Sequence, residues 1–350
     1  MGETPSVPLS RPRTRAAVVA AAAVVAVAVA AGIAAVVTLD STGGGANTFP
    51  VESRYDDSQY AKTDPALVIY DEAARIGTGF AEPRGVAAHH DGRILVAGDG
   101  AVRVFSKEGE RLADWSVAGE PRTLAVSRAG LMYVVMPEHV VVLGEDGSAA
   151  ASWPPFGGRA YLTSVAVSED GQDVFVADAG NKVVYRCDPS GAVVARIGER
   201  APDRHVPGLV VYQPCLDVCV GRDGFLRVVS PGMHRVESYG FTGDLVAQWG
   251  RVGPTMDAFS GCCNPVNVAL FPDDAMVTAE KHLPRVKVSD GAGRLVGVVV
   301  GVEGFEGRPK GIDVAVDPDW RVLVLDPSSR SVRVFVRKAG RGGPGSRPAD

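Results

Sequence analysis

The chain has 350 residues, and 46% of them are hydrophobic, so it can bury the core of one large domain or two ordinary ones. Charged residues make up 22% and the formal net charge is −5, which excludes the basic field that holds a nucleic-acid backbone. The 42 glycines and 24 prolines indicate many turns. The five cysteines are too few for a dense disulfide framework. We therefore expect a globular protein with no nucleic-acid partner.

Residues 16–38 form an apolar segment, rich in Ala and Val, that no charged residue interrupts. It predicts a transmembrane helix, because a helix of this length crosses the roughly 30 Å of hydrocarbon in a bilayer. Three arginines lie within residues 11–15, and no Lys or Arg follows until Arg54. This asymmetry predicts a single-pass protein of the cell membrane, with residues 1–15 cytoplasmic and the remainder periplasmic or extracellular. A cleaved signal peptide is the alternative.

The rest of the chain divides into three expected segments. Residues 39–64 are rich in Gly, Ser and Asp, which is typical of a flexible linker. Residues 338–350 are rich in Gly, Pro and Arg, which predicts a disordered tail. The folded domain is therefore expected over residues 65–337.

A pattern of two apolar stretches around a turn recurs six times in the folded part. The six segments are PRGVAAHHDGRILVAG from Pro83, PRTLAVSRAGLMYVVM from Pro121, LTSVAVSEDGQDVFVAD from Leu162, CLDVCVGRDGFLRVVS from Cys215, PVNVALFPDDAMVTAE from Pro265 and KGIDVAVDPDWRVLVLD from Lys310. Alternating apolar residues around such a turn indicate a β-hairpin. A second hairpin follows in most units, so each unit holds four short strands.

Glycines mark the expected turns, because these turns need a residue that adopts positive φ without strain. The first hairpins turn at Gly92, Gly130, Gly171 and Gly224, with Asp274 and the pair Asp319-Trp320 in the last two units. The second hairpins turn at Gly109, Gly147, Gly191, Gly243 and Gly293.

Four strands per unit and a period of about 40–50 residues predict an all-β fold, a six-bladed β-propeller. The sixth unit ends after Val336 without a fourth strand, and a strand-like stretch at residues 66–77 precedes the first unit. We expect this stretch to complete the last blade, which leaves no long sheet edge open. Alternating valines of the innermost strands are expected to pack between blades; they are Val165, Val167, Val218, Val220, Val314 and Val316. Trp115, Trp153 and Trp249, which end fourth strands, are expected to pack as well.

Several units resemble the NHL repeat, whose pattern contains V-x-D, then N-x-R-V, then D-x-x-G. The third unit reads VFVADAGNKVVYRCDPSG and the fourth ends PGMHRVESYGFTGDLVAQWG. The residues on this pattern are Asp178, Asn181, His234, Arg235, Arg285, Val286 and Asp326. The resemblance covers about residues 65–337 and implies a six-bladed propeller of the NHL type, similar to bacterial membrane-anchored NHL-repeat proteins. NHL-like propellers include protein- and RNA-binding modules and lyases, so the resemblance alone does not choose a function.

The cysteines are the most specific candidates for a site. Cys215 leads into the innermost strand of the fourth unit, and Cys262 and Cys263 lead into that of the fifth. Consecutive innermost strands are neighbours in a propeller, so we expect these three cysteines to approach one another on one face. Four interpretations remain open: a structural disulfide from Cys215 to Cys262 or Cys263, a vicinal Cys262–Cys263 disulfide with a redox role, a metal bound by all three, and free buried thiols.

Three residues near these cysteines are further ligand or redox candidates: Asn264, Glu280 and His282. Glu280 with Lys281 could act in acid–base chemistry, although an exposed loop ion pair is the simpler expectation. His282 stands before a third strand, where a histidine suits a turn. No histidine spacing typical of zinc is present, so no metal or other cofactor is predicted apart from the thiolate alternative.

These observations favour a non-catalytic binding or scaffold module that is attached to the membrane through residues 16–38. Loops on one face would bind an envelope protein or another ligand. The alternative is a metal-dependent lyase or hydrolase, or a redox protein that uses Cys262 and Cys263. No nucleophile-elbow, P-loop, zincin or EF-hand motif is present, so no catalytic residue is assigned.

Overall fold

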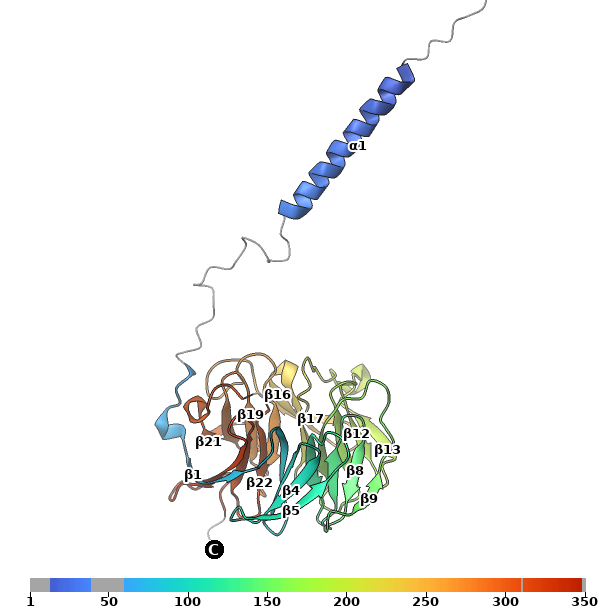
Figure 1. Cartoon of the computed structure of the whole chain (residues 1–350). Helices are drawn as coiled ribbons and strands as arrows, with labels where there is room; N and C mark the ends of the chain where they lie inside the picture. Colours follow the sequence, from blue (N-terminus) through green and yellow to red (C-terminus); the bar gives the residue numbers. More distant parts are fainter. Residues whose placement is uncertain (1–12, 39–59, 310, 348–350) are drawn as a thin grey trace, which may run out of the picture. The chain divides into compact units, whose positions relative to one another are not determined.

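The computed structural model describes residues 13–38, 60–309 and 311–347 (Figure 1). The chain divides into two compact units, Met1–Asp56 and Asp57–Asp350. Most of the predicted cytoplasmic segment, residues 1–12, and of the predicted linker, residues 39–59, lies outside the described residues.

The first unit contains one helix, α1 (Arg13–Thr38), whose many alanines favour helix. The predicted membrane segment, residues 16–38, lies within it, and its described side chains, those of residues 18–30, are exposed. In the part of the chain that the structure describes, no helix combines the length and the apolar character that a membrane crossing requires. The transmembrane part of the predicted fold is therefore not supported by these residues.

The second unit contains six four-stranded antiparallel sheets, each of which is one blade. Blade 1 consists of β2 (Pro83–Ala88), β3 (Ile94–Gly98), β4 (Ala101–Phe105) and β5 (Arg111–Ser116). Blade 2 consists of β6 (Thr123–Val126), β7 (Met132–Val135), β8 (Val140–Leu143) and β9 (Ala149–Ser152). Blade 3 consists of β10 (Leu162–Val167), β11 (Val174–Asp178), β12 (Val183–Cys187) and β13 (Val193–Ile197).

The remaining blades follow the same order. Blade 4 consists of β14 (Val218–Val220), β15 (Leu226–Ser230), β16 (Arg235–Tyr239) and β17 (Leu245–Trp249). Blade 5 consists of β18 (Asn267–Leu270), β19 (Met276–Glu280), β20 (Arg285–Ser289) and β21 (Leu295–Val300). Blade 6 consists of β22 (Asp313–Val316), β23 (Val322–Asp326), β24 (Ser331–Arg337) and β1 (Tyr70–Gly77). Short 3-10 helices cover η3 (Pro65–Leu67), η4 (Pro202–Arg204), η5 (Pro231–Met233) and η6 (Val302–Gly304).

The blades form a closed ring. The innermost strands β2, β6, β10, β14, β18 and β22 contact one another in that order, and β22 contacts β2. The N-terminal strand β1 pairs antiparallel with β24 and so supplies the fourth strand of blade 6. The predicted six-bladed, all-β propeller and its closure by residues 66–77 are confirmed.

The predicted turn glycines adopt the backbone conformation that motivated the prediction. All nine of them have positive φ. Asp274 and Trp320, which replace glycine in blades 5 and 6, also have positive φ, at 60° and 62°. The hairpin assignment from these turns is therefore confirmed.

A large side chain at the end of an outer strand packs on a turn glycine of the next blade. The pairs are Trp115 with Gly147, Trp153 with Gly191 and Trp249 with Gly293. A Cβ on Gly147 would lie 2.3 Å from the Trp115 ring, so no side chain fits between them. Ile76 of β1 packs on Gly109 of blade 1 in the same way, and the closing strand thus reproduces the contact made elsewhere in the ring.

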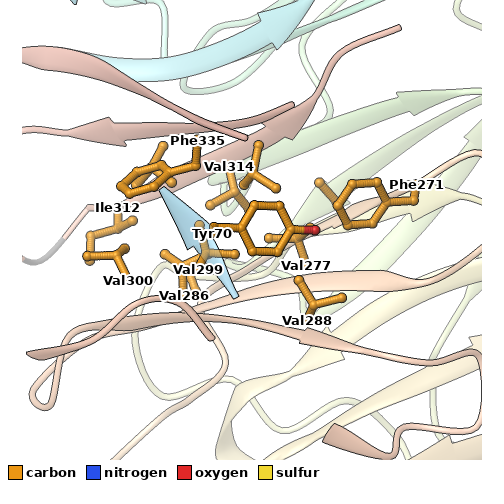
Figure 2. Packing of buried hydrophobic residues seen from close by; sticks show 14 of the residues in the cluster. Tyr70, Phe271, Val277, Val286, Val288, Val299, Val300, Ile312, Val314 and Phe335 are labelled. Carbon is orange, nitrogen blue, oxygen red and sulfur yellow. The ribbon is translucent and has the colours of Figure 1, made fainter. Parts of the chain in front are cut away.

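Buried valines and aromatic residues fill the spaces between blades. Figure 2 shows the cluster between blades 5 and 6, where Val277 and Val286 lie beside Val314 and Tyr70 of the next blade. Full burial of one such side chain stabilises the fold by about 1.5–3 kcal/mol.

The predicted inter-blade valines divide into two groups. Val165, Val218 and Val314 are buried in these clusters, as predicted. Val167, Val220 and Val316 also pack against these clusters, as predicted. They are only half-buried, because they also line a cavity at the ends of the innermost strands.

The C-terminal tail packs on the propeller as far as residue 347, which differs from the predicted disorder. The Arg337 guanidinium donates to the carbonyl oxygens of Gly342 at 3.2 Å and Pro344 at 2.6 Å. The Gly345 amide donates to the Asp273 carboxylate at 2.7 Å. One arginine with several donors thus orders a glycine-rich stretch that has no apolar pattern of its own.

Candidate functional site

One small or polar residue from each innermost strand occupies the same place in the sheet register. These six residues, which we call the inner ring, are Gly85, Thr123, Ser164, Asp217, Asn267 and Asp313. Gly85 has no room for a side chain, because a Cβ would lie 2.5 Å from the Cα of Thr123. The inner ring lies where the six blades come closest together.

Side chains of four inner-ring residues each join their blade to the following one. Asp217 accepts a hydrogen bond from the Val268 amide of blade 5 at 2.6 Å, and Asp313 accepts one from an amide of blade 1 at 2.8 Å. The Ser164 hydroxyl accepts from blade 4, and the Asn267 amide donates to a carbonyl of blade 6. Because each bond crosses a blade boundary, the ring holds the propeller's centre together.

The two carboxyl groups of the inner ring are unusual because they lie deep in the protein. Burial raises the pKa of Asp217 to about 6, partly offset by its hydrogen bond to Ser164. Burial, together with the charge of Asp217, raises the pKa of Asp313 to about 7. Both side chains keep some accessible surface. Near neutral pH the pair therefore exchanges protons with solvent.

Sequence reasoning missed this pair, although a signal is present. Asp217 and Asp313 stand in the strings LDV and IDV, inside valine-rich strands. Aspartate is disfavoured within strands, so its recurrence at one place in two repeats indicates a specific role. The sequence analysis treated those strands only as inter-blade core.

A cavity of about 220 Å³ opens where the innermost strands begin, on the side that we call the start face. All six blades contribute to its wall, through Arg84, Arg122, Thr163, Cys215, Asn267 and Gly311 among others. We call it the start-face cavity. Asn267 belongs both to this wall and to the inner ring, so the cavity lies directly beside the ring.

The start-face cavity carries two arginines with different surroundings. Arg84 forms ion pairs with Glu82 at 2.9 Å and Glu120 at 3.3 Å, which neutralise its charge. Arg122 lies with its guanidinium carbon 3.6 Å from the centre of the Tyr161 ring. The Arg122 Nε is buried without a hydrogen-bond partner. Its charge is thus stabilised by an aromatic face and not by a carboxylate.

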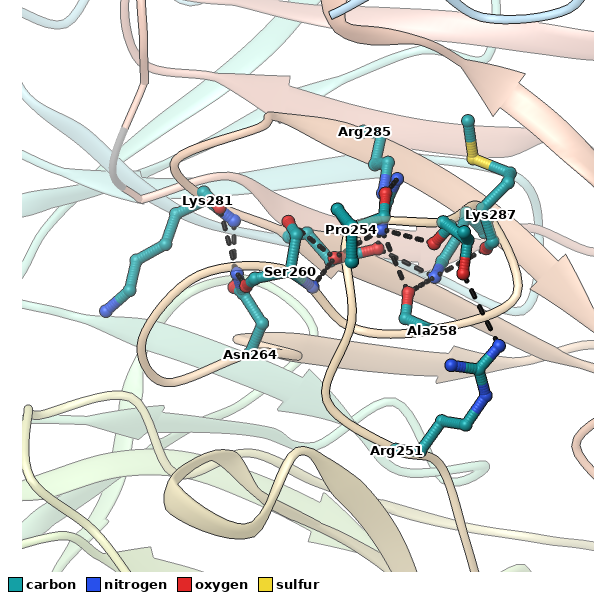
Figure 3. Close-up of polar contacts among 11 residues, drawn as sticks. Arg251, Pro254, Ala258, Ser260, Asn264, Lys281, Arg285 and Lys287 are labelled. Carbon is teal, nitrogen blue, oxygen red and sulfur yellow. Dashed lines mark hydrogen bonds and ion pairs between the residues drawn. The ribbon is translucent and has the colours of Figure 1, made fainter. Parts of the chain in front are cut away.

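Lys281 supplies a second cation, beside Cys215 of the cavity wall. Its ammonium group contacts the Gln213 side-chain oxygen and lies 3.9 Å from the Cys215 sulfur. Among the described residues, neither Lys281 nor Arg122 forms an ion pair with a carboxylate. Figure 3 shows the Lys281 side chain extending away from the buried polar cluster beside it.

The structure brings the three predicted cysteines into one neighbourhood. Cys262 lies close enough to Cys215 to contribute to the raised pKa of the Cys215 thiol, and the Cys262 and Cys263 sulfurs are 3.0 Å apart. Cys262 is exposed and Cys263 is buried. Burial raises the pKa of the Cys215 thiol, opposed by Lys281, and burial with the adjacent Cys262 raises that of Cys263 to about 11.

The predicted disulfides are not supported, because all five cysteines are free thiols in the structure. Cys215 lies beside the Lys281 ammonium group and is not bonded to Cys262 or Cys263. The redox and metal-binding roles suggested for these cysteines stay predictions.

Glu280 does not form the expected exposed ion pair with Lys281. Its carboxylate is fully buried and contacts Arg285 Nε at 2.8 Å and Lys287 Nζ at 2.7 Å (Figure 3). Burial alone raises the pKa of Glu280, but the two cations hold it below its usual value. Lys287 and Arg285 also donate to the Ala258 carbonyl oxygen, at 2.8 and 2.9 Å. This buried cluster fixes the loop that carries Cys262 and Cys263.

Asn264 and His282 support the same loop. The Asn264 carboxamide is buried, accepts from the Lys281 amide and donates to the Lys281 carbonyl oxygen, both at 2.9 Å. His282 has a positive φ of 75° and its ring lies against Gly261. Both residues hold the backbone here, and their predicted ligand or redox roles stay untested.

Another group of possible metal ligands lies outside this site. Within the described residues, the set with three ligand atoms within 4.8 Å of one another is His89, Asp91 and Glu145. Arg93 already contacts the Asp91 and Glu145 carboxylates, at 2.7 and 2.9 Å. A cation would therefore have to displace this guanidinium.

A second cavity, of about 550 Å³, opens where the innermost strands end. Its wall contains the half-buried Val167, Val220 and Val316. Charged residues of both signs surround it. Two of them, Arg128 and Glu169, form an ion pair at 2.9 Å. Arg222, another cation of this wall, forms no ion pair with a carboxylate among the described residues.

Comparisons with known proteins support the fold and leave the family open. No protein-family model matches the chain, and no curated protein matches its sequence. A structural genomics protein of unknown function from Bacteroides thetaiotaomicron is similar at a TM-score of 0.57 and 15% identity, over 77% of this chain and 76% of that one. Virginiamycin B lyase from Staphylococcus aureus is similar at 0.55 and 8%, over 77% and 100%. A streptogramin B lyase is similar at 0.53 and 11%, over 79% and 100%. At these identities the likeness establishes a six-bladed β-propeller and nothing about chemistry.

Proposed function

We propose that this propeller is a non-catalytic binding module that holds an anionic group of its ligand in the start-face cavity. The observation that carries the proposal is a pair of cations, Arg122 in the cavity wall and Lys281 beside the wall residue Cys215, which have no carboxylate partner among the described residues. Concave sites with unpaired cations attract carboxylates and phosphates strongly, because water screens charges less there.

The inner ring should make this affinity depend on pH. Asp217 and Asp313 lie next to the cavity, and burial raises the pKa of both. A charged carboxylate repels an anion, and a protonated carboxyl group does not. The affinity of the cavity for anions should therefore increase as pH falls through the pKa values of this pair.

The location of the module at the cell envelope is part of this proposal and is supported by the sequence alone. The support consists of the uncharged residues 16–38 and the arginines within residues 11–15. Carbonate extraction of membranes from expressing cells, followed by protease treatment of intact spheroplasts, tests it. A protein that stays in the soluble fraction contradicts membrane attachment.

Thermal unfolding in sodium benzoate tests the binding site. Benzoate, an aromatic carboxylate, is compared with neutral benzamide at constant ionic strength. A ligand at ten times its Kd stabilises the native state by about 1.4 kcal/mol. We expect benzoate to raise Tm by about 2–4 °C, benzamide to leave it unchanged, and the effect to disappear in the double variant Arg122→Gln, Lys281→Gln.

The matched control is Arg128→Gln on the opposite mouth, whose side chain is 73% exposed. It should keep the full benzoate effect. If this control loses the effect as well, or if the double variant keeps it, benzoate acts on the protein non-specifically and the proposed site is wrong.

A further inference from the structure

The start face carries exposed apolar side chains beside its unpaired cations. Tyr212 is 72% exposed and Met233 is 43% exposed. The two lie together, because a Cβ on Gly232, the neighbour of Met233, would meet Tyr212 Cε2 at 2.9 Å. Tyrosine and methionine are enriched in protein interfaces, so this exposed pair is a candidate contact for a ligand.

The chain connects this apolar pair directly to the cation site. Tyr212 is followed by Gln213, which contacts the Lys281 ammonium group, and then by Pro214 in the cavity wall. A ligand that places an anion beside Lys281 at the cavity wall can therefore rest its next apolar group on Tyr212. The arrangement combines one charged and one apolar subsite.

The size of the cavity limits what enters it. A volume of about 220 Å³ accommodates a chain end and excludes a folded surface. The wall offers the Asn267 carboxamide as a neutral donor, because only one of its two N–H groups is used in the bond to the Ile312 carbonyl oxygen. A polypeptide terminus matches these features, because its carboxylate is small and planar and a side chain stands one bond away.

We propose that the start face captures a protein or peptide by its free C-terminal carboxylate, which Arg122 and Lys281 hold, while Tyr212 and Met233 pack against the apolar side chain of its last residue. This inference rests on the proposed function and specifies the ligand. The carboxylate provides the charge complementarity, and the apolar side chain distinguishes a polypeptide end from a simple anion.

A pull-down with a peptide pool tests the inference. The probe is a pool of fluorescein-labelled hexapeptides randomised at the last two positions, made once with free C-terminal carboxylates and once as C-terminal amides. We expect immobilised protein to retain the carboxylate pool at least tenfold better than the amide pool. Mass spectrometry of the retained peptides should show apolar last residues.

Variants separate the two subsites. Tyr212→Ser should weaken retention of the carboxylate pool at least threefold and remove the apolar preference. The benzoate-induced rise in Tm should become smaller, because the benzoate ring can also rest on Tyr212, but should not disappear as it does in the double variant. The matched control is Val194→Ser, which removes a side chain that is 59% exposed on the outer strand β13. It should change neither readout. Unaltered Tm values without ligand verify that the variants fold.

The possible outcomes distinguish this inference from the proposed function. Equal retention of the amide pool, or full retention by Tyr212→Ser, overturns the C-terminal inference. If benzoate raises Tm but no peptide is retained, the anion site stands and the inference is wrong. If neither ligand has an effect, both proposals are wrong.

Discussion

Asp217 shows how one residue can couple the stability of the propeller to pH. Its carboxylate accepts the Val268 amide of the next blade, yet burial raises its pKa to about 6. The equivalent residue of blade 5 is Asn267, which makes a similar bond to blade 6 without a charge. Asn267 is therefore a neutral counterpart of Asp217 within the same protein.

The substitution Asp217→Asn should stabilise the protein at pH 8 by about 1–3 kcal/mol. The pKa of Asp217 is higher in the folded state than in the unfolded state, so the folded state binds more protons between about pH 4 and pH 6. The contribution of Asp217 to stability is therefore present at low pH and is lost as pH rises through that window. The variant should lack that decrease. Urea unfolding at pH 4, 6 and 8 measures the free energy of unfolding of the wild type and the variant.

The exposed Asp203 provides the control. Asp203→Asn should follow the wild-type pH profile within about 0.5 kcal/mol. A variant Asp217→Asn that is less stable than wild type at pH 8 would show that its carboxylate is charged and favourable in the fold, contrary to the raised pKa.

The turn glycines of the hairpins have two different roles. Some are required only because the turn needs positive φ, and others also leave room for a side chain of the neighbouring blade. Gly171 has φ of 71°, and a Cβ added there would meet nothing within 4 Å, whereas Gly147 has φ of 82° and the Trp115 ring at 2.3 Å from such a Cβ. The sequence predicted both as turns from the same pattern. The packing role of Gly147 depends on a residue of another blade, so local pattern could not reveal it.

We expect Gly171→Ala to cost about 1–2 kcal/mol, which is the penalty for a Cβ in the left-handed region. Gly147→Ala should cost about 2–5 kcal/mol, because overpacking against Trp115 adds to the same penalty. Chemical denaturation of the two variants measures the difference. Equal losses would mean that the Trp115 ring moves aside freely and that the inter-blade contact contributes little.

The loop before β18 is held by charge rather than by apolar packing. Glu280 neutralises Arg285 and Lys287 inside the protein, and these cations bind loop carbonyl groups. Sequence reasoning placed Glu280 in an exposed pair because Lys281 follows it. The partners that matter lie on the adjacent strand β20, so only the strand pairing reveals them.

The substitution Glu280→Gln should destabilise the protein by about 3–5 kcal/mol, because two buried cations lose their partner. It should also loosen the loop and increase the alkylation rate of the buried Cys263. Denaturation and mass-spectrometric mapping of iodoacetamide adducts measure the two effects. The double variant Glu280→Gln, Lys287→Met should recover part of the stability. If it recovers none, repulsion between unpaired cations is not the cause of the loss.

At the scale of the whole molecule, the sequence was sufficient for blade number, strand order and ring closure. These features follow from a pattern that recurs six times in the sequence, so an irregular motif in one unit does not change the prediction. The cavities and the inner ring were not predictable in the same way. They arise where residues of all six blades meet, and their chemistry depends on small differences such as Asp217 in one repeat and Asn267 in the next.

Closure of the ring by β1 should be required for a stable propeller. β1 covers the edge of β24, buries Tyr70 and Ile76, and packs on blade 1 through Gly109. A chain that begins at residue 78 should therefore lose the cooperative unfolding transition and aggregate, because an unpaired strand edge and apolar surface become exposed. A chain that begins at residue 57 removes only the other compact unit and should unfold at the full-length Tm.

A point variant tests the same contact without removing the strand. Ile76→Ala should cost about 2–4 kcal/mol, since it leaves a cavity against blade 1. If the chain from residue 78 unfolds cooperatively at the same temperature as the chain from residue 57, blade 6 is stable with three strands. Closure by β1 would then be incidental to the ring, and the start-face cavity, whose wall includes blade 6, would not depend on it.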